Sequence, residues 1–341
     1  MTDPQQPQLP EGLALACVAA VDRGAFRILD GTREVPAELA GKFYFLADTP
    51  EELPCVGDRV AVQYHDGGAA AIIHSLLPRQ SVLRRRRAGD KVEYQMIAAN
   101  IDMAFIVQSC HFDFNIRRMD RYLVMAADGG VEPILLLTKI DLVTPEALAE
   151  MIAAIRAAGI TARIIPLSNH TGAGLEEFRS LLTPGRSCCL LGSSGVGKTT
   201  LINRLLEREA FNTKEVSATG EGTHATSRRQ LTLLENGAMV IDTPGMRELG
   251  LLASGEGLEL GFDDIQSLGA GCRYSDCTHL REPGCAVRAA VAAGSLSQER
   301  YDSYLKLKKE SDFYGMSYAE KRKKDKEFGR FINKALKQIK K

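Results

Sequence analysis

The chain has 341 residues, more than one ordinary domain contains, so we expect two or three hydrophobic cores. Hydrophobic residues make up 45% and charged residues 25% of it, a balance typical of soluble globular proteins that excludes disorder throughout. The sequence has no run of eighteen apolar residues, and its start, MTDPQQPQLPEG, is polar and Pro-rich, without a basic, apolar leader. We therefore expect a cytoplasmic protein without a membrane contact.

The net charge is zero, with 43 basic and 43 acidic residues, but basic residues gather locally. From Lys306 to Lys341 thirteen Lys or Arg stand against five Asp or Glu, and Arg84 to Arg87 form a second basic patch. Such a chain can bind nucleic acid locally without being a general polycation. On charge alone, a solvated helix that only keeps the protein soluble fits the tail equally well.

Residues 1–11 are predicted to be disordered, and residues 12–80 consist of short β segments separated by turn signals. The expected strands are ALACVAAV, AFRILD, KFYFLA, DRVAVQYH and AAIIHSLL. Five strands in so short a segment predict a small β-barrel, for which an OB-fold is the natural candidate. The charged residues 81–99 are expected to form a linker.

From residue 100 to residue 251 apolar strands alternate with helices, which predicts a parallel α/β sheet. The expected strands IDMAFIVQS, EPILLLTK, ARIIPLS, RSCCLLG and GAMVID are apolar runs of the kind that a sheet buried on both faces requires. The expected helices are PEALAEMIAAIRAAG, with Pro145 in its first turn and Gly159 past its end, and GLEEFRSLL.

The segment GSSGVGKT fits the pattern G-x-x-x-x-G-K-[ST], with the strand SCCLL before it and the helical TLINRLLE after it. Gly192 and Gly197 let the backbone fold around an anion, so that N–H groups and the helix N-terminus face phosphates. Lys198 would bring its charge to the β- and γ-phosphates, and Thr199 its hydroxyl to Mg²⁺. A Gly-rich turn that matches by accident is the alternative. The predicted nucleotide-binding residues here are Gly192, Ser193, Ser194, Gly195, Val196, Gly197, Lys198, Thr199 and Thr200.

Asp242-Thr243-Pro244-Gly245 ends the strand AMVI and fits the pattern D-x-x-G. There the carboxylate of Asp242 can hold Mg²⁺ through water, and the amide of Gly245 can sense the γ-phosphate. By itself this pattern is more often a turn. Its position at a strand end, after a phosphate loop, favours the functional interpretation.

Guanine recognition is predicted for Thr138, Lys139, Ile140 and Asp141, which close the strand ILLL. The carboxylate of Asp141 can accept hydrogen bonds from the N1 and N2 donors of guanine, whereas adenine would leave it unpaired. Lys139 would lay its stem along the base. Ser168 and neighbouring amides, after IIPLS, are expected at the guanine oxygen. One alternative is that Lys139 and Asp141 lie in a solvated loop without a ligand. Another is that the site binds adenine nucleotides.

These base-reading segments precede the phosphate loop, whereas ordinary GTPases have the reverse order. A permuted sheet can still assemble, because crossovers join parallel strands and chain ends can be relocated when the old ends lie close together. This order, with AANID, DFNIRRMDRYLV, TKID, GSSGVGKTTLIN and DTPGMRELG, resembles the RsgA (YjeQ) family. The resemblance covers nearly the whole chain. It implies an OB-fold, a circularly permuted P-loop GTPase domain and a zinc domain, with GTP hydrolysis stimulated by the small ribosomal subunit during its late maturation.

The segment GEGTHATSRR resembles the family's G-x-H-T-T-[TS] element and retains His224 and Thr226. Ala225 departs from the pattern, so the Mg²⁺ role goes to Thr226, with Thr223 as the alternative. Many GTPases place a water-orienting Gln directly after the D-x-x-G glycine, but Met246 stands there and cannot orient water. We hypothesise that His224 positions the nucleophile, the alternative being a loop histidine without a role.

Cys272, Cys277, His279 and Cys285 supply three thiolates and one imidazole, enough for closed tetrahedral coordination of one structural Zn²⁺. The segment around them has few apolar residues and would fold poorly without metal. Unrelated buried thiols are the alternative. Residues 252–341 are therefore predicted to be a mainly helical zinc-binding domain that ends in a basic helix.

We expect a monomeric GTPase that binds GTP, GDP and Mg²⁺, and contacts the rRNA of the small ribosomal subunit through its barrel, the arginine patch and the basic tail. Most of the support for the rRNA contact comes from the resemblance to the family. One alternative is an RNA-binding module, switched by nucleotide, with little turnover. Another is a GTPase of metal delivery, which the closed ligand set disfavours.

Overall fold

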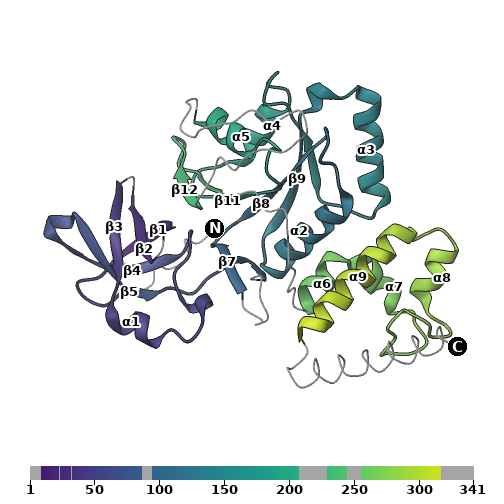
Figure 1. Cartoon of the computed structure of the whole chain (residues 1–341), viewed down its shortest axis with the longest axis horizontal. Coiled ribbons are helices and arrows are strands. Elements are labelled where there is room, and N and C mark those ends of the chain that lie inside the picture. Colours follow the sequence, from purple (N-terminus) through teal and green to yellow (C-terminus); the bar gives the residue numbers. More distant parts are fainter. Residues whose placement is uncertain are drawn as a thin grey trace, which may run out of the picture.

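Three parts follow one another along the chain in the structure, a computed structural model (Figure 1). It describes residues 9–22, 24–31, 33–86, 94–206, 229–243 and 255–315. Residues 1–8, Arg87, His224, Thr226 and Gly245 lie outside the described residues, as does the basic tail from residue 316. Within the described ranges, none of the helices combines the length and the apolar character that crossing a membrane requires.

The N-terminal part is a closed five-stranded barrel, as predicted. Its strands are β1 (Ala14–Asp22), β2 (Ala25–Asp30), β3 (Arg33–Leu39), β4 (Arg59–His65) and β5 (Ala70–Leu76). They pair in the order β1-β2-β3-β5-β4, and β4 returns to β1 and closes the barrel. Alternate side chains point inward, so Val18, Ile28, Val60 and Ile73 are fully buried in one core.

One of the five expected strands is wrong. KFYFLA forms the helix α1 (Gly41–Leu46), and the third strand is β3 instead. The aromatic content of KFYFLA favoured a strand, but two of its aromatic side chains face solvent: Tyr44 is 68% and Phe45 88% exposed. In β3 a weak alternation is hidden by a proline, yet Val35 and Ala37 are buried while Pro36 between them is exposed. The short 3-10 turns η1 (Pro50–Glu52) and η2 (Asp66–Gly68) complete this part.

The expected linker contains a two-stranded antiparallel ribbon, β6 (Val82–Arg86) with β7 (Tyr94–Ala99). The backbone N–H of Ala99 donates to the carbonyl oxygen of Val56, in the N-terminal part, over 2.9 Å. The backbone N–H of Val82 donates to the carbonyl oxygen of Gly129, in the central part, over 3.0 Å. The ribbon therefore fastens the two parts to each other.

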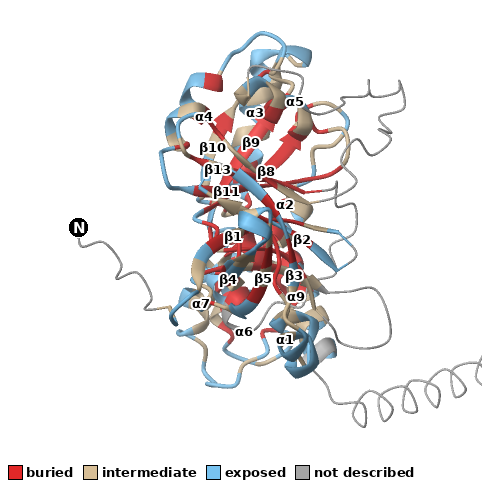
Figure 2. Ribbon diagram, turned by 90° about the vertical axis from the view of Figure 1, so that its left-hand side faces the viewer, coloured by how far each residue is buried: buried red, intermediate tan, exposed pale blue. Residues whose placement is uncertain are grey.

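The central part is an α/β sheet with the strand order β10-β9-β8-β11-β13-β12. Its strands are β8 (Met103–Ser109), β9 (Glu132–Thr138), β10 (Arg163–Pro166), β11 (Ser187–Leu191), β12 (Gln230–Leu233) and β13 (Met239–Asp242). The helices between them are α2 (Ile116–Asp128), η3 (Ile140–Leu142), α3 (Pro145–Ala157), α4 (Leu175–Leu181) and α5 (Lys198–Leu205). All pairs are parallel except β12 with β13, and β12 was not predicted. Buried residues follow these strands (Figure 2).

β12 also pairs with the barrel. Ala20 of β1 and Gln230 of β12 are antiparallel partners, so barrel and α/β sheet form one continuous eleven-stranded sheet. Sequence periodicity cannot reveal such a pair, because its two strands lie more than two hundred residues apart and β12 has only 4 residues.

The C-terminal part is helical, with α6 (Gly255–Gly261), α7 (Asp263–Gly269), α8 (Ala286–Ala292) and α9 (Gln298–Gly315). Helix α6 lies against α2 at very short range. A Cβ atom added at Gly257 would come within 2.4 Å of Cβ of Asp128, and one at Gly261 within 2.7 Å of Cγ2 of Val124. Only glycine fits at these two positions, which let the two helix backbones approach.

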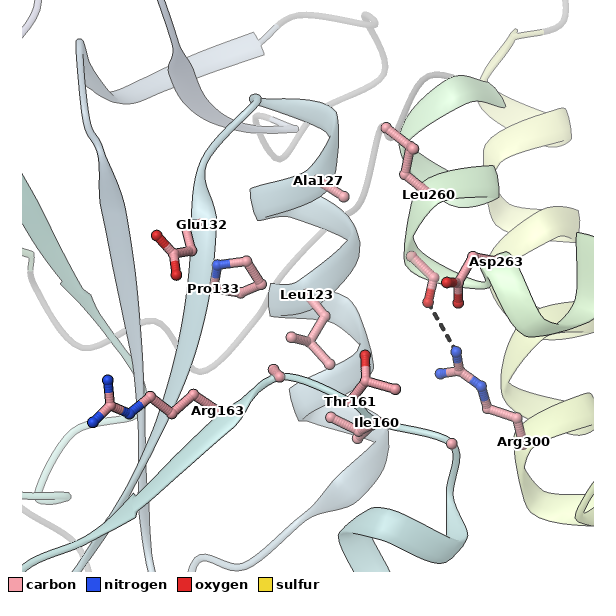
Figure 3. Close-up of a pocket in the computed structure, with 13 residues that line it drawn as sticks. Leu123, Ala127, Glu132, Pro133, Ile160, Thr161, Arg163, Leu260, Asp263 and Arg300 are labelled. Atoms are coloured by element: carbon pink, nitrogen blue, oxygen red, sulfur yellow. Dashed lines mark hydrogen bonds between the residues drawn. The ribbon is translucent and has the colours of Figure 1, made fainter. Parts of the chain in front are cut away.

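Arg300 of α9 holds this helical part on the α/β domain. Its guanidinium is 3% exposed and pairs with Asp120 of α2 and with Asp264 of α7, both at 3.0 Å. Its Nη2 also donates to the carbonyl oxygen of Gly261 over 2.9 Å. Figure 3 shows this contact beside a groove of about 370 Å³ between α2, the start of β10 and α6. A buried charge paired on both sides is costly to disrupt, so these contacts fix the orientation of the helical part.

Candidate functional site

The predicted phosphate loop runs from the end of β11 to the start of α5, and its backbone turns tightly between them. Gly192 has a φ of 154°, and a Cβ atom there would come within 2.5 Å of the carbonyl oxygen of Val107. Gly197 has a φ of 100° and caps α5. Glycine is required at both positions, as the motif predicted, and the N-terminus of α5 carries N–H groups without partners in the helix.

Lys198 lies inside this loop and is 6% exposed. Its Nζ atom donates to the carbonyl oxygens of Gly192, over 2.9 Å, and Ser193, over 2.7 Å. Burial lowers the pKa of Lys198 to about 8, against the opposing influence of Asp242 and Asp113. The Oγ atom of Ser193 is buried without a hydrogen-bond partner. A buried cation beside an unsatisfied hydroxyl is the arrangement that an oxyanion such as phosphate completes.

The strand predicted to read the base, β9, meets the predicted phosphate loop through Thr138 at its end. Its Oγ1 atom donates to the carbonyl oxygen of Val196 over 2.7 Å, although 58 positions separate the two residues. Lys139 follows with a φ of 60°, and burial lowers its pKa. Asp141 lies in the following turn with an exposed side chain. The segment that ends β9, before Gly192 in sequence, and the phosphate loop after Gly192 are therefore in contact.

Ser168, just after β10, holds the carboxylate of Asp141. Its Oγ atom donates to Oδ1 of Asp141 over 2.5 Å and accepts from the backbone N–H groups of His170 and Thr171. The hydroxyl thereby fixes the direction of the carboxylate. A planar donor pair such as the N1–H and N2–H edge of guanine fits a carboxylate held in this way.

Asp242 lies at the end of β13, beside Leu190 of β11, and is 1% exposed. The next residue, Thr243, donates from Oγ1 to the carbonyl oxygen of Leu190 over 2.6 Å. Thr199 stands in the first turn of α5. The ends of β9, β10, β11 and β13 lie at one edge of the sheet, where parallel α/β folds bind ligands.

The structure brings together the predicted residues of both strand ends and of the phosphate loop. Of the predicted catalytic residues it describes Asp242, while His224, Thr226 and Gly245 lie outside the described residues. Two neighbours of the site were missed. Asp113 acts electrostatically on Lys139 and Lys198, and Asn169 contacts the phosphate loop. Asn169 could have been suspected, because it directly follows Ser168, whereas no local pattern marks Asp113.

The four predicted metal ligands form one group in the C-terminal part, with ligand atoms that lie within 4.8 Å of one another. Sγ of Cys272 is 3.9 Å from Sγ of Cys285 and 3.6 Å from Nδ1 of His279. A tetrahedral zinc with bonds of about 2.3 Å to sulfur and about 2.0 Å to nitrogen separates its ligands by roughly these distances. Together with Cys277, these residues could hold one metal ion, and the soft donor set disfavours Mg²⁺ and Ca²⁺.

Backbone groups support two of the sulfur atoms. The N–H groups of Ala286 and Arg288, at the start of α8, donate to Sγ of Cys272 and of Cys285 respectively. Tyr301 donates its hydroxyl to the carbonyl oxygen of His279 over 2.5 Å. The ligand group is thus built into the packing of α8 and α9, which is typical of a structural site.

The fold and the phosphate loop together define a P-loop nucleotide-binding domain, in which the strands predicted to read the base precede the phosphate loop in sequence. A sequence model described as RsgA GTPase matches residues 76–252. The chain is 41% identical over 307 residues to "Small ribosomal subunit biogenesis GTPase RsgA 2" of Lactiplantibacillus plantarum, covering 90% of this chain and 86% of the relative. It is 40% identical over 318 residues to "Small ribosomal subunit biogenesis GTPase RsgA" of Opitutus terrae, with the same two coverages.

Solved structures agree with the fold. The crystal structure of YjeQ from Thermotoga maritima matches with a TM-score of 0.66 at 24% identity, covering 89% of this chain and 100% of that one. YloQ, described as a circularly permuted GTPase, matches with a TM-score of 0.62 at 23% identity, covering 90% of this chain and 98% of that one. This chain belongs to the RsgA GTPase family and is a GTP hydrolase.

Proposed function

We propose that this GTPase binds the small ribosomal subunit and acts in its late maturation, with hydrolysis of GTP stimulated by the subunit. The names of relatives about 40% identical over most of the chain support the target. The observation that carries the nucleotide assignment is the contact between Thr138 and Val196, because it joins a base-reading strand to the phosphate loop. The active form is proposed to be a cytoplasmic monomer.

In the proposed mechanism Asp141 accepts hydrogen bonds from N1 and N2 of guanine, with Ser168 holding it in place. The backbone N–H of Asn169, which has no acceptor among the described residues, donates to the guanine oxygen. Amides of the phosphate loop donate hydrogen bonds to the phosphates, and the ammonium group of Lys198 neutralises part of their charge. Thr199 and Thr226 would hold Mg²⁺, with Asp242 reaching it through water. Bound there, the ion would supply charge neutralisation at the β- and γ-phosphates.

The nucleophilic water needs a positioning group, which Met246 cannot supply. We propose His224 for this role, completed on the ribosome. Replacing His224 with Ala is expected to remove the stimulated turnover while GTP affinity stays unchanged, since the side chain would contact water rather than the nucleotide. Single-turnover hydrolysis with saturating small subunits measures the first, and fluorescent-GTP titration the second. Stimulated turnover that survives the substitution would rule out this role.

Zinc is the proposed occupant of the cysteine and histidine group, with a structural role, because four protein ligands leave no open position. Removing the metal with a chelator is expected to unfold the helices around α8 while GDP affinity changes less than about twofold, since the ligand group is separate from the nucleotide pocket. Circular dichroism, metal analysis and GDP titration give the three readouts. Cys17→Ser changes a cysteine of the barrel, outside the ligand group, and should therefore retain one metal per chain. A purified protein without zinc would contradict the proposal.

Contacts with rRNA are proposed for the barrel and the basic tail. Within the arginine patch, Arg84 contributes less to this proposal, because it already pairs with Glu51 at 3.0 Å and with Asp128 at 3.6 Å and lies over the ring of Tyr94. Its charge is used inside the protein. Phosphate contacts by Lys and Arg would make subunit binding salt-dependent.

Turnover with and without small subunits tests the proposed function. Small subunits should raise the rate of GTP hydrolysis, and large subunits or free RNA at equal concentration should not. A rate that no ribosomal particle changes would contradict the proposed target while leaving GTP binding intact. Equal stimulation by free RNA would favour an RNA-binding module instead.

A further inference from the structure

Asn169 touches the phosphate loop from the base-reading side of the pocket. Its Nδ2 atom donates a hydrogen bond to the carbonyl oxygen of Gly197 over 3.1 Å. Its own carbonyl oxygen accepts from Nε of Arg204, also over 3.1 Å, in the last turn of α5. One residue of the loop after β10 is therefore tied to both ends of the helix that begins with Lys198.

The carbonyl oxygen of Gly197 accepts two hydrogen bonds, from Nδ2 of Asn169 over 3.1 Å and from the backbone N–H of Leu201 in α5 over 2.9 Å. Asn169 therefore helps to fix the direction of the next N–H group. Every described peptide bond is trans, and in a planar trans peptide C=O and N–H point in opposite directions. An amide that holds the carbonyl of Gly197 thus also aims the N–H of Lys198, which has no acceptor inside its own helix. The contact is close, because a Cβ atom at Gly197 would lie 3.0 Å from Nδ2 of Asn169.

The preceding residue is tied to the base-reading carboxylate. Ser168 bonds to Asp141 over 2.5 Å, so the dipeptide Ser168-Asn169 connects Asp141 on one side with Gly197 on the other. The amide oxygen Oδ1 of Asn169 is buried without a hydrogen-bond partner. A buried acceptor left unsatisfied is unfavourable for folding. The hydrogen bond from Nδ2 to Gly197 is what favours this orientation of the side chain.

We propose that Asn169 is a positioning residue of the phosphate loop, which aims the backbone N–H of Lys198 at the nucleotide's phosphates through its bond to Gly197. The inference rests on the nucleotide assignment proposed above and adds a residue that acts without touching the base through its side chain. Loss of the amide donor of Asn169 should therefore weaken the binding of the β-phosphate and leave the recognition of the base unchanged.

Two variants separate the donor from the volume of the side chain. Asn169→Asp keeps the size but replaces the donor with an acceptor that faces a carbonyl, and Asn169→Ala removes the group. We expect the affinity for GDP to fall about tenfold in both variants, as for the loss of one good hydrogen bond. The affinity for GMP, which lacks the β-phosphate, should fall less than about twofold. The preference for GDP over inosine diphosphate, which lacks the 2-amino group, should stay unchanged.

Competition against a fluorescent GDP gives these affinities, and thermal unfolding of the nucleotide-free variants reports their stability. His170→Ala, an exposed neighbour in the same loop, is the matched control and should behave like the unchanged chain. Equal losses for GDP and GMP would reveal a merely structural role and overturn the proposal, as would unchanged GDP affinity in Asn169→Asp. If the unchanged chain did not prefer GDP to ADP, the nucleotide assignment itself would fail first.

Discussion

Replacing Lys198 with Ala is expected to lower GTP turnover and GDP affinity by at least about a hundredfold, because it removes the buried cation at the phosphates. In the free protein this cation already donates to two carbonyl oxygens of the loop, so its ammonium group is held in place before the nucleotide binds. Steady-state hydrolysis and GDP titration measure the two effects. Lys42→Ala, on the exposed helix α1, is the control and should change neither. Retention of full affinity in Lys198→Ala would remove the phosphate loop from the proposed site.

The same lysine predicts a pH dependence of binding. Burial lowers the pKa of Lys198 to about 8 in the free protein, and bound phosphates would raise it, because they favour the charged form. Below pH 8 the group is charged in both states, and the affinity gains nothing from further acid. Above pH 8 binding must take up a proton, so GDP affinity should fall up to about tenfold per pH unit. In Lys198→Ala this dependence should disappear.

Replacing Asp141 with Asn is expected to lower GDP affinity by about a hundredfold and to favour xanthosine diphosphate. The amide keeps an oxygen for the N1 donor, but its NH₂ group faces the 2-amino group of guanine. Xanthine carries an oxygen at that place and accepts from the amide. Ser168 can still donate to the amide oxygen, as it does to the carboxylate over 2.5 Å, so the loop geometry is retained.

Competition of the two diphosphates against fluorescent GDP measures this exchange. Glu150→Gln, on the exposed face of α3, removes an equal charge away from the pocket and should leave both affinities unchanged. If Asp141→Asn kept the preference for guanine, the base would be read elsewhere, and the assignment of this strand end would be wrong.

The parts of the proposed nucleotide site could be named from the sequence, because each of them is a short local pattern with its own physical reason. Gly192 and Gly197 are fixed by backbone sterics, and Asp141 is fixed by hydrogen-bond chemistry at a strand end. The sequence could not predict how these parts meet. The bonds from Thr138 to Val196 and from Asn169 to Gly197 join residues 58 and 28 positions apart. Such contacts depend on the sheet order, which short patterns do not encode.

Other features failed for a different reason. KFYFLA was expected to be a strand from its aromatic residues, but tertiary contacts decide whether such residues are buried in a sheet. Arg300 was not singled out at all, since its partners Asp120 and Asp264 are far away in sequence and each looks like an ordinary surface carboxylate. Gly257 and Gly261 disfavour a helix by their intrinsic propensity, yet the close packing of α6 on α2 requires them.

The pairing of β1 with β12 has a consequence for any shortened form of the chain. β12 is the last strand of the α/β sheet, and β1 of the barrel pairs with it at Gln230. Without residues 1–80, the edge of β12 would lose this partner at Gln230, and an unpaired strand edge can pair with strands of other molecules. The barrel therefore protects its neighbour against self-association, whatever else it binds.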